Sequence, residues 1–231
     1  GNGVRILSLS SGSNSFLWNE HEPNGRKSGL SAFAFCSESK QLAIAPCGSE
    51  PTVLVYTYPG KRLERTFKSD TKLSYSDVAF SRNGKYLAAI GGLPDYTFTI
   101  WDVLTGNTVV TGKLPQPCNF VSFNPLDDTK VVVGGEKGMF FYTISKHIDG
   151  ITLTFIEALP PVEEDELDEL DSEDEEDEDD AAPKEKAPEK PEDVQGPRKS
   201  FSCHCWGKDN QVYASSRSGT VALFSHKTGE S

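Results

Sequence analysis

The chain has 231 residues, 36% of them hydrophobic and 10% aromatic, with 20 glycines, 14 prolines and a formal net charge of −12. Residues 163–180 hold 15 of the 35 acidic residues and no Lys or Arg, which leaves 20 acidic against 23 basic residues elsewhere. A chain that is nearly neutral outside one short stretch is neither a generally acidic disordered protein nor a basic nucleic-acid-binding one.

Neither a membrane span nor a disulfide framework is expected. No apolar run approaches the ~20 residues that a transmembrane helix needs. The first residues, Gly1-Asn2-Gly3, show no secretory signal and no initiator methionine, so we expect a piece of a longer protein. The five cysteines are scattered and odd in number, which is typical of reduced thiols in a cytosolic compartment.

Four segments of the chain repeat one pattern, in which two apolar strands flank a turn and a third strand runs on towards a glycine. The expected strands are 33–35, 42–45 and 53–56; 78–80, 87–90 and 98–101; 121–123, 131–133 and 140–142; and 203–206, 212–214 and 221–224. Residues 1–18 have the pattern of the last two strands of an earlier unit. Turn residues support these strands, since Asn83-Gly84 supplies the positive φ of a tight hairpin.

The spacing of the middle strands identifies the architecture. It is 45 residues from Leu42 to Leu87, 44 from Leu87 to Val131 and 81 from Val131 to Val212. A period of 40 to 45 residues with short strands and glycine-containing turns is typical of the four-stranded blades of a β-propeller. The last interval exceeds one period by 37 residues, which indicates an insertion before the repeat resumes.

The predicted fold is therefore all-β: an incomplete propeller, about four blades of a larger ring, with a disordered acidic insertion. We expect a partial first blade and three complete blades in residues 1–159, the insertion in 160–199, and a further partial blade in 200–231. The insertion buries too little apolar surface to offset the entropy of ordering it. It is interpreted either as a solvated spacer or as an electrostatic contact for a basic partner. A defined calcium site is not expected, since no glycine occurs between Gly150 and Gly196.

A literal Trp-Asp dipeptide, Trp101-Asp102, ends a third strand, which is where WD40 repeats carry it, so the propeller resembles the WD40 type.

The runs 51–59, 93–101 and 121–125 resemble segments of the cilia- and flagella-associated WD-repeat proteins of the paired 43 and 44 type. This resemblance covers residues 1–159 and 200–231. It implies a scaffold of the ciliary or flagellar axoneme, in the cytoplasmic cytoskeleton, that tethers an inner-arm dynein to the doublet microtubule. Its implied partners are axonemal dynein, tubulin and a paired WD-repeat subunit. The alternative is a cytosolic or nuclear WD40 adaptor whose acidic loop binds basic proteins such as histones.

No catalytic, cofactor or metal site is predicted, and neither membrane nor nucleic acid is an expected partner. The four histidines lie in no nucleophile motif, and there is no phosphate-binding loop. Cys203-His204-Cys205 is interpreted as packing in an inner strand, because alternate strand residues point to opposite faces and cannot converge on one ion. The candidate partner contacts are Tyr58 and Tyr96, as aromatics near strand ends, and Arg62 and Arg65, in the densest basic group together with Lys68 and Lys72.

Overall fold

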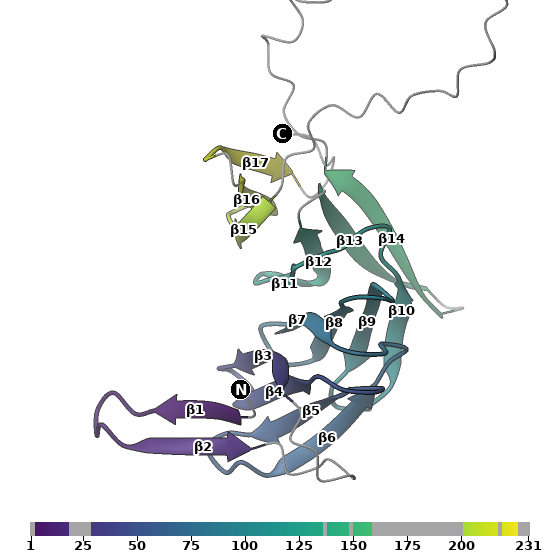
Figure 1. Ribbon diagram of the computed structural model, residues 1–231. Coiled ribbons are helices and arrows are strands. Elements are labelled where there is room, and N and C mark those ends of the chain that lie inside the picture. Colours follow the sequence, from purple (N-terminus) through teal and green to yellow (C-terminus); the bar gives the residue numbers. More distant parts are fainter. Residues whose placement is uncertain are drawn as a thin grey trace, which may run out of the picture.

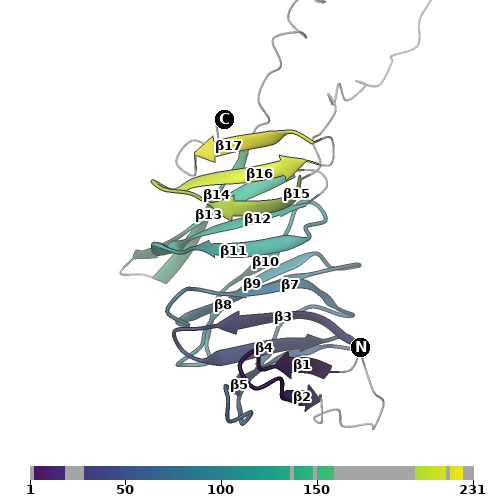
Figure 2. The same cartoon turned by 90° about the vertical axis from the view of Figure 1, so that its left-hand side faces the viewer.

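The computed structural model describes residues 3–18, 29–135, 138–147, 150–158, 201–216 and 219–225. All regular secondary structure within these ranges is β-strand, and the strands form five antiparallel sheets. The sheets stack face to face in chain order along a curve (Figures 1 and 2). We number them sheet 1 to sheet 5 from the N-terminus.

The strands of each sheet follow one another in chain order. Sheet 1 pairs β1 (Gly3–Leu7) with β2 (Asn14–Trp18). Sheet 2 consists of β3 (Leu30–Cys36), β4 (Gln41–Pro46), β5 (Thr52–Thr57) and β6 (Leu63–Lys68). Sheet 3 consists of β7 (Tyr75–Phe80), β8 (Tyr86–Gly91), β9 (Thr97–Asp102) and β10 (Thr108–Lys113). Sheet 4 consists of β11 (Phe120–Asn124), β12 (Asp127–Gly135), β13 (Gly138–His147) and β14 (Gly150–Ala158). Sheet 5 consists of β15 (Phe201–Trp206), β16 (Gln211–Ser216) and β17 (Val221–Ser225).

The middle strands of sheets 2, 3 and 4 are largely buried on both faces, which is why they appear in the sequence as continuous apolar runs. All six residues of β8 and five of the six residues of β9 are buried. The fourth strands β6 and β10 are mostly exposed and carry polar residues. Every strand predicted in the four repeats is present, and residues 1–18 form the expected pair of strands. The acidic insertion, 160–199, lies outside the described residues.

Each pair of neighbouring sheets shares its own apolar cluster, because alternate side chains of one strand face opposite neighbours. On β4, Leu42 and Ile44 face sheet 1, whereas Ala43 faces sheet 3. The same division recurs along the stack. The cluster between sheets 2 and 3 includes Val55, Phe67, Tyr75, Leu87 and Trp101; that between sheets 3 and 4 includes Ile90, Phe98, Ile100, Val131 and Phe140; that between sheets 4 and 5 includes Phe120, Phe141, Phe201 and Phe224.

Asp77 joins two sheets through its carboxylate. Its Oδ1 accepts the backbone N–H of Val78 and its Oδ2 that of Val121 in sheet 4, both at 2.9 Å. The register of β7 against β8 shifts between Tyr75 and Asp77, next to this contact. Burial raises the pKa of this carboxyl, while the two backbone hydrogen bonds oppose the rise.

Replacing Asp77 by alanine should lower the free energy of unfolding by about 2 kcal/mol, because two buried N–H groups lose their acceptor. Urea unfolding of the full-length protein measures the change. Asp95→Ala is the matched control. Its carboxylate accepts only the exposed Lys72 N–H, at 2.8 Å, so its loss should cost less than about 1 kcal/mol. Equal effects of the two substitutions would contradict a linking role for Asp77.

Candidate interaction surface

The Trp-Asp dipeptide at the end of β9 lies within the packed stack. Trp101 is 1% exposed, and its ring centroid lies 5.3 Å from that of Phe67 in sheet 2. The carboxylate of Asp102 accepts the backbone N–H of Thr105 at 2.8 Å, which closes the turn into β10 and lowers the pKa of Asp102. This geometry gives both residues a part in packing and turn formation.

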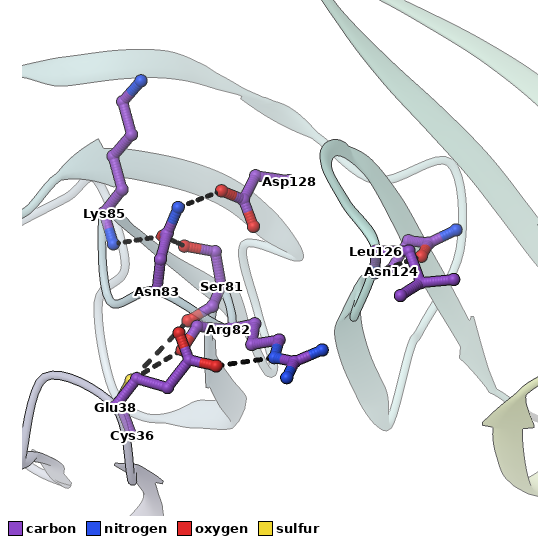
Figure 3. A network of polar contacts seen from close by, with 9 residues as sticks. All are labelled: Cys36, Glu38, Ser81, Arg82, Asn83, Lys85, Asn124, Leu126 and Asp128. Atoms are coloured by element: carbon purple, nitrogen blue, oxygen red, sulfur yellow. Dashed lines mark hydrogen bonds and ion pairs between the residues drawn. The ribbon is translucent and has the colours of Figure 1, made fainter.

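A polar network joins the turns between the first and second strands of sheets 2, 3 and 4 (Figure 3). Arg82 Nε donates to Glu38 Oε1 at 2.6 Å, and Asn83 donates its amide N–H to the Asp128 carboxylate. The thiol of Cys36 donates to the Arg82 carbonyl at 3.2 Å. Each bond links residues 44 to 46 positions apart, so the network repeats with the period of the sheets.

Beside this network a groove of about 780 Å³ runs between sheets 2 and 3. It is lined by Ser39, Gln41, Arg62, Leu63, Glu64, Arg65, Asn83, Gly84, Lys85, Val103 and Leu104. The structure thus brings together the two arginines that the sequence singled out, at the start of β6. It adds Lys85 of sheet 3, which sequence reasoning did not connect to them. We call this surface the basic groove.

The two candidate tyrosines lie away from the basic groove. Tyr58 follows β5, packs edge-on to Phe35 with ring centroids 5.3 Å apart, and lines an apolar hollow of about 340 Å³ beside β1. Tyr96 precedes β9 and packs, half-buried, against the cluster between sheets 3 and 4. The four candidate contacts therefore do not form one patch.

The Cys203-His204-Cys205 run lies on β15, and its side chains alternate as expected. His204 stacks on Phe120 of sheet 4 with ring centroids 4.2 Å apart, and its Nε2 lies 2.5 Å from Ser122 Oγ. Burial lowers the pKa of His204 to about 4. The prediction that the whole run packs inside is wrong for the two cysteines. Both are exposed, because they face away from sheet 4 onto the outer face of sheet 5.

The described ranges contain no group of three or more His, Cys, Asp or Glu side chains that could hold a metal ion. Burial raises the pKa of the Cys118 thiol to about 12, which disfavours the thiolate that nucleophilic or redox chemistry needs. In the same part of the chain, no helix has the length and apolar character to cross a membrane. The acidic stretch 163–180, where no defined calcium site is expected, lies outside the described residues.

Stacked antiparallel sheets of up to four strands, repeated every 44 to 45 residues, define the chain as a β-propeller of the WD40 type. Two solved structures share this fold. The β-propeller domain of Cps50 (Swd1) from Myceliophteria thermophila has a TM-score of 0.62 and 12% sequence identity over 89% of this chain and 56% of that one. U3-55K has a TM-score of 0.62 and 14% identity over 99% of this chain and 56% of that one.

The related sequences narrow the class further. Cilia- and flagella-associated protein 44 is 29% identical over 54% of this chain in Mus musculus and 28% over 64% in Chlamydomonas reinhardtii. Cilia- and flagella-associated protein 43 of Mus musculus is 21% identical over 82% of this chain. The chain is thus a distant homologue of these WD-repeat proteins, and it spans between 7% and 12% of their length. No family model matches it.

Proposed function

We propose that this chain is part of a non-enzymatic WD40 scaffold of the axoneme, which tethers an inner-arm dynein to the doublet microtubule and supports ciliary motility. The observation that carries the proposal is the similarity to cilia- and flagella-associated proteins 43 and 44 across WD-repeat sequence, at 21% to 29% identity. A WD40 propeller is typically a non-catalytic platform for protein partners. Dynein, tubulin and a paired WD-repeat subunit are the proposed partners.

The proposal includes further blades beyond the described stack. On sheet 2, Phe33 and Phe35 are 63% and 50% exposed, and on the outer face of sheet 5 Val221 is 69% exposed. Faces between neighbouring sheets are covered by apolar clusters. Phe33 and Phe35 line a hollow beside the two-stranded sheet 1, so their exposure favours further strands in that sheet, and the exposed Val221 favours a further sheet of a larger ring beside sheet 5. The proposed division remains blades in 1–159 and 200–231, separated by the insertion in 160–199.

One observation favours a second candidate function. Residues 163–180 hold 15 carboxylates in 18 positions, a density that attracts strongly basic proteins. A cytosolic or nuclear WD40 adaptor that binds histones through this stretch would use the same propeller as its platform. The two functions differ in where the protein resides.

Localisation of the tagged full-length protein in ciliated cells separates the two functions. The scaffold function predicts that the protein stays with the axoneme after detergent extraction of the membrane. It also predicts that deleting residues 163–180 leaves this fraction unchanged. Nuclear staining that depends on residues 163–180 would instead support the adaptor and contradict the axonemal scaffold.

A further inference from the structure

The basic groove between sheets 2 and 3 has a cationic lining. It contains Arg62, Arg65 and Lys85, and its one carboxylate, Glu64, already accepts a hydrogen bond from Gln41 Nε2 at 2.9 Å. Among the described residues, the ion pairs join Lys68 to Glu50, Arg82 to Glu38 and Lys130 to Asp127. None of them uses a cation of the groove, although Lys85 contributes slightly to the lowered pKa of nearby Asp102.

The walls of the groove are held in place before any ligand arrives. Arg65 donates from Nη2 to the backbone oxygen of Leu104, which ties β6 to the turn after β9. The backbone of Lys85 donates its N–H to Asn83 Oδ1 at 2.9 Å and accepts the N–H of Val103 at 2.8 Å. Only Arg65 is held at its charged end; Lys85 is held at its backbone, and its Nζ lies 5.0 Å from the ring centroid of Tyr86. A cation that is already positioned, as Arg65 is, binds an anion with less loss of conformational entropy than a free side chain does.

Gly84 shows how closely the two sheets meet at the groove. Its φ is +73°, and a Cβ built there would lie 2.3 Å from Ser39 Oγ and 2.5 Å from Ser39 Cβ. The turn of sheet 3 therefore sits directly on sheet 2, and no side chain can separate them. This contact fixes the backbone of the turn that carries Lys85 relative to sheet 2.

The dimensions of the groove suit an extended peptide. Its volume of about 780 Å³ exceeds what a single small anion needs. Stacked sheets lie ~10 Å apart and an extended chain advances ~3.3 Å per residue, so carboxylates about three residues apart can reach cations on both sheets. The lining contains no aromatic side chain on which a base could stack, which disfavours a nucleic acid.

We propose that the basic groove binds an extended acidic segment of a partner protein, with its carboxylates on Arg62, Arg65 and Lys85. The inference rests on the proposed scaffold function, since it names the chemistry of one partner. The partner is preferred to the acidic stretch of this same chain because that stretch is inserted between sheets 4 and 5, whereas the groove lies between sheets 2 and 3.

The test is fluorescence anisotropy of the full-length protein with a fluorescein-labelled eight-residue polyglutamate peptide. Arg62→Glu with Arg65→Glu should weaken binding at least tenfold, about 1.4 kcal/mol. Lys113→Glu with Lys208→Glu makes the same change of charge at exposed lysines outside the groove, and should weaken binding less than about twofold. Raising the salt from about 0.1 M to about 1 M should abolish the difference, since the Debye length falls from ~10 to ~3 Å. Arg62→Gln with Arg65→Gln, checked by thermal melting, repeats the test with a milder change.

Three outcomes would overturn the proposal. Equal weakening by the two charge-reversed pairs would show diffuse attraction without a site. Tighter binding of a single-stranded oligonucleotide than of polyglutamate would identify a nucleic-acid surface. If the groove variant speeds glutamyl-endopeptidase cleavage within residues 163–180, the chain's own acidic stretch occupies the groove. Axonemal localisation does not depend on these outcomes, so failure here is distinguishable from failure of the scaffold function.

Discussion

Replacing Trp101 by alanine should lower the free energy of unfolding by about 4 kcal/mol, roughly twice the cost expected for Asp77→Ala. Trp101 is among the largest fully buried side chains of the described residues. Its ring packs on Phe67 of the neighbouring sheet, so its loss opens a cavity between sheets 2 and 3 and removes an aromatic contact.

The large effect follows from the position of the cavity as well as from its size. The middle strands around Trp101 are buried on both faces, and Leu87 and Val103 beside it are 0% and 4% exposed. Backbone hydrogen bonds hold β9 between β8 and β10, so the strands cannot move far to fill the space. A cavity that cannot collapse costs more than the transfer of the lost side chain alone.

Chemical denaturation of the full-length protein, followed by far-UV circular dichroism, measures this change. Leu104→Ala, three residues along the chain, is the matched control. Leu104 is 79% exposed, so its truncation should change stability by less than about 0.5 kcal/mol. Trp101→Phe should fall between the two, because it retains an aromatic ring. A cost below about 1 kcal/mol for Trp101→Ala would show that sheets 2 and 3 do not depend on this contact.

The strands that the sequence predicted are those whose burial leaves a clear pattern. Strands such as β8 and β12 are apolar along much of their length because both of their faces are covered, and their period of 44 to 45 residues is visible in the sequence alone. The fourth strands of sheets 2, 3 and 4 were not located in advance. In β6 only Phe67 is fully buried, and the other residues are exposed or half-exposed, so neither alternation nor an apolar run identifies the strand.

The basic groove was only partly predictable. The sequence grouped Arg62 and Arg65 with Lys68 and Lys72, but the structure separates them. Lys68, at the end of β6, pairs with Glu50 at 2.8 Å and does not line the groove that contains Arg62 and Arg65. Lys85 joins the arginines only through the stacking of sheet 3 on sheet 2. Stacking of distant segments leaves no local signal in the sequence.

The links between sheets carried a signal that could have been found. Glu38 and Arg82 are 44 residues apart, as are Asp77 and Val121. Aligning the repeats would have placed these pairs at neighbouring turns and strands, and the opposite charges of the first pair would have suggested a contact. The carboxylate of Asp77 has no such counterpart, since its partner across the sheets is a backbone N–H.

Acidification should weaken the packing of sheet 5 on sheet 4 through His204. Burial lowers the pKa of this imidazole to about 4 in the folded protein, whereas an unfolded chain has a histidine pKa of about 6.5. Between these values the unfolded chain binds more protons, so the free energy of unfolding falls as the pH falls. The contribution is fully present above about pH 6.5, and up to about 3 kcal/mol is lost by about pH 4.

The surroundings of His204 explain why the neutral form is preferred. Its ring lies on Phe120, and its Nε2 faces the Ser122 hydroxyl, which also accepts the Trp206 Nε1–H at 2.9 Å. With Trp206 as donor, the Ser122 hydroxyl is free to donate its proton to a neutral Nε2. Protonation would replace this acceptor by a second donor, and would bury a charge against an aromatic ring.

A comparison with His204→Gln isolates this effect from the other groups that titrate at acidic pH. Glutamine keeps a polar group near Ser122 but does not titrate, so the stability advantage of the unmodified protein should shrink by up to about 3 kcal/mol between pH 7 and pH 4. His147→Gln, at an exposed position of β13, makes the same substitution away from the junction of sheets 4 and 5 and serves as the control. Urea unfolding at each pH gives the three curves. Parallel curves for the unmodified protein and His204→Gln would show that His204 is not held in its neutral form at the junction of sheets 4 and 5.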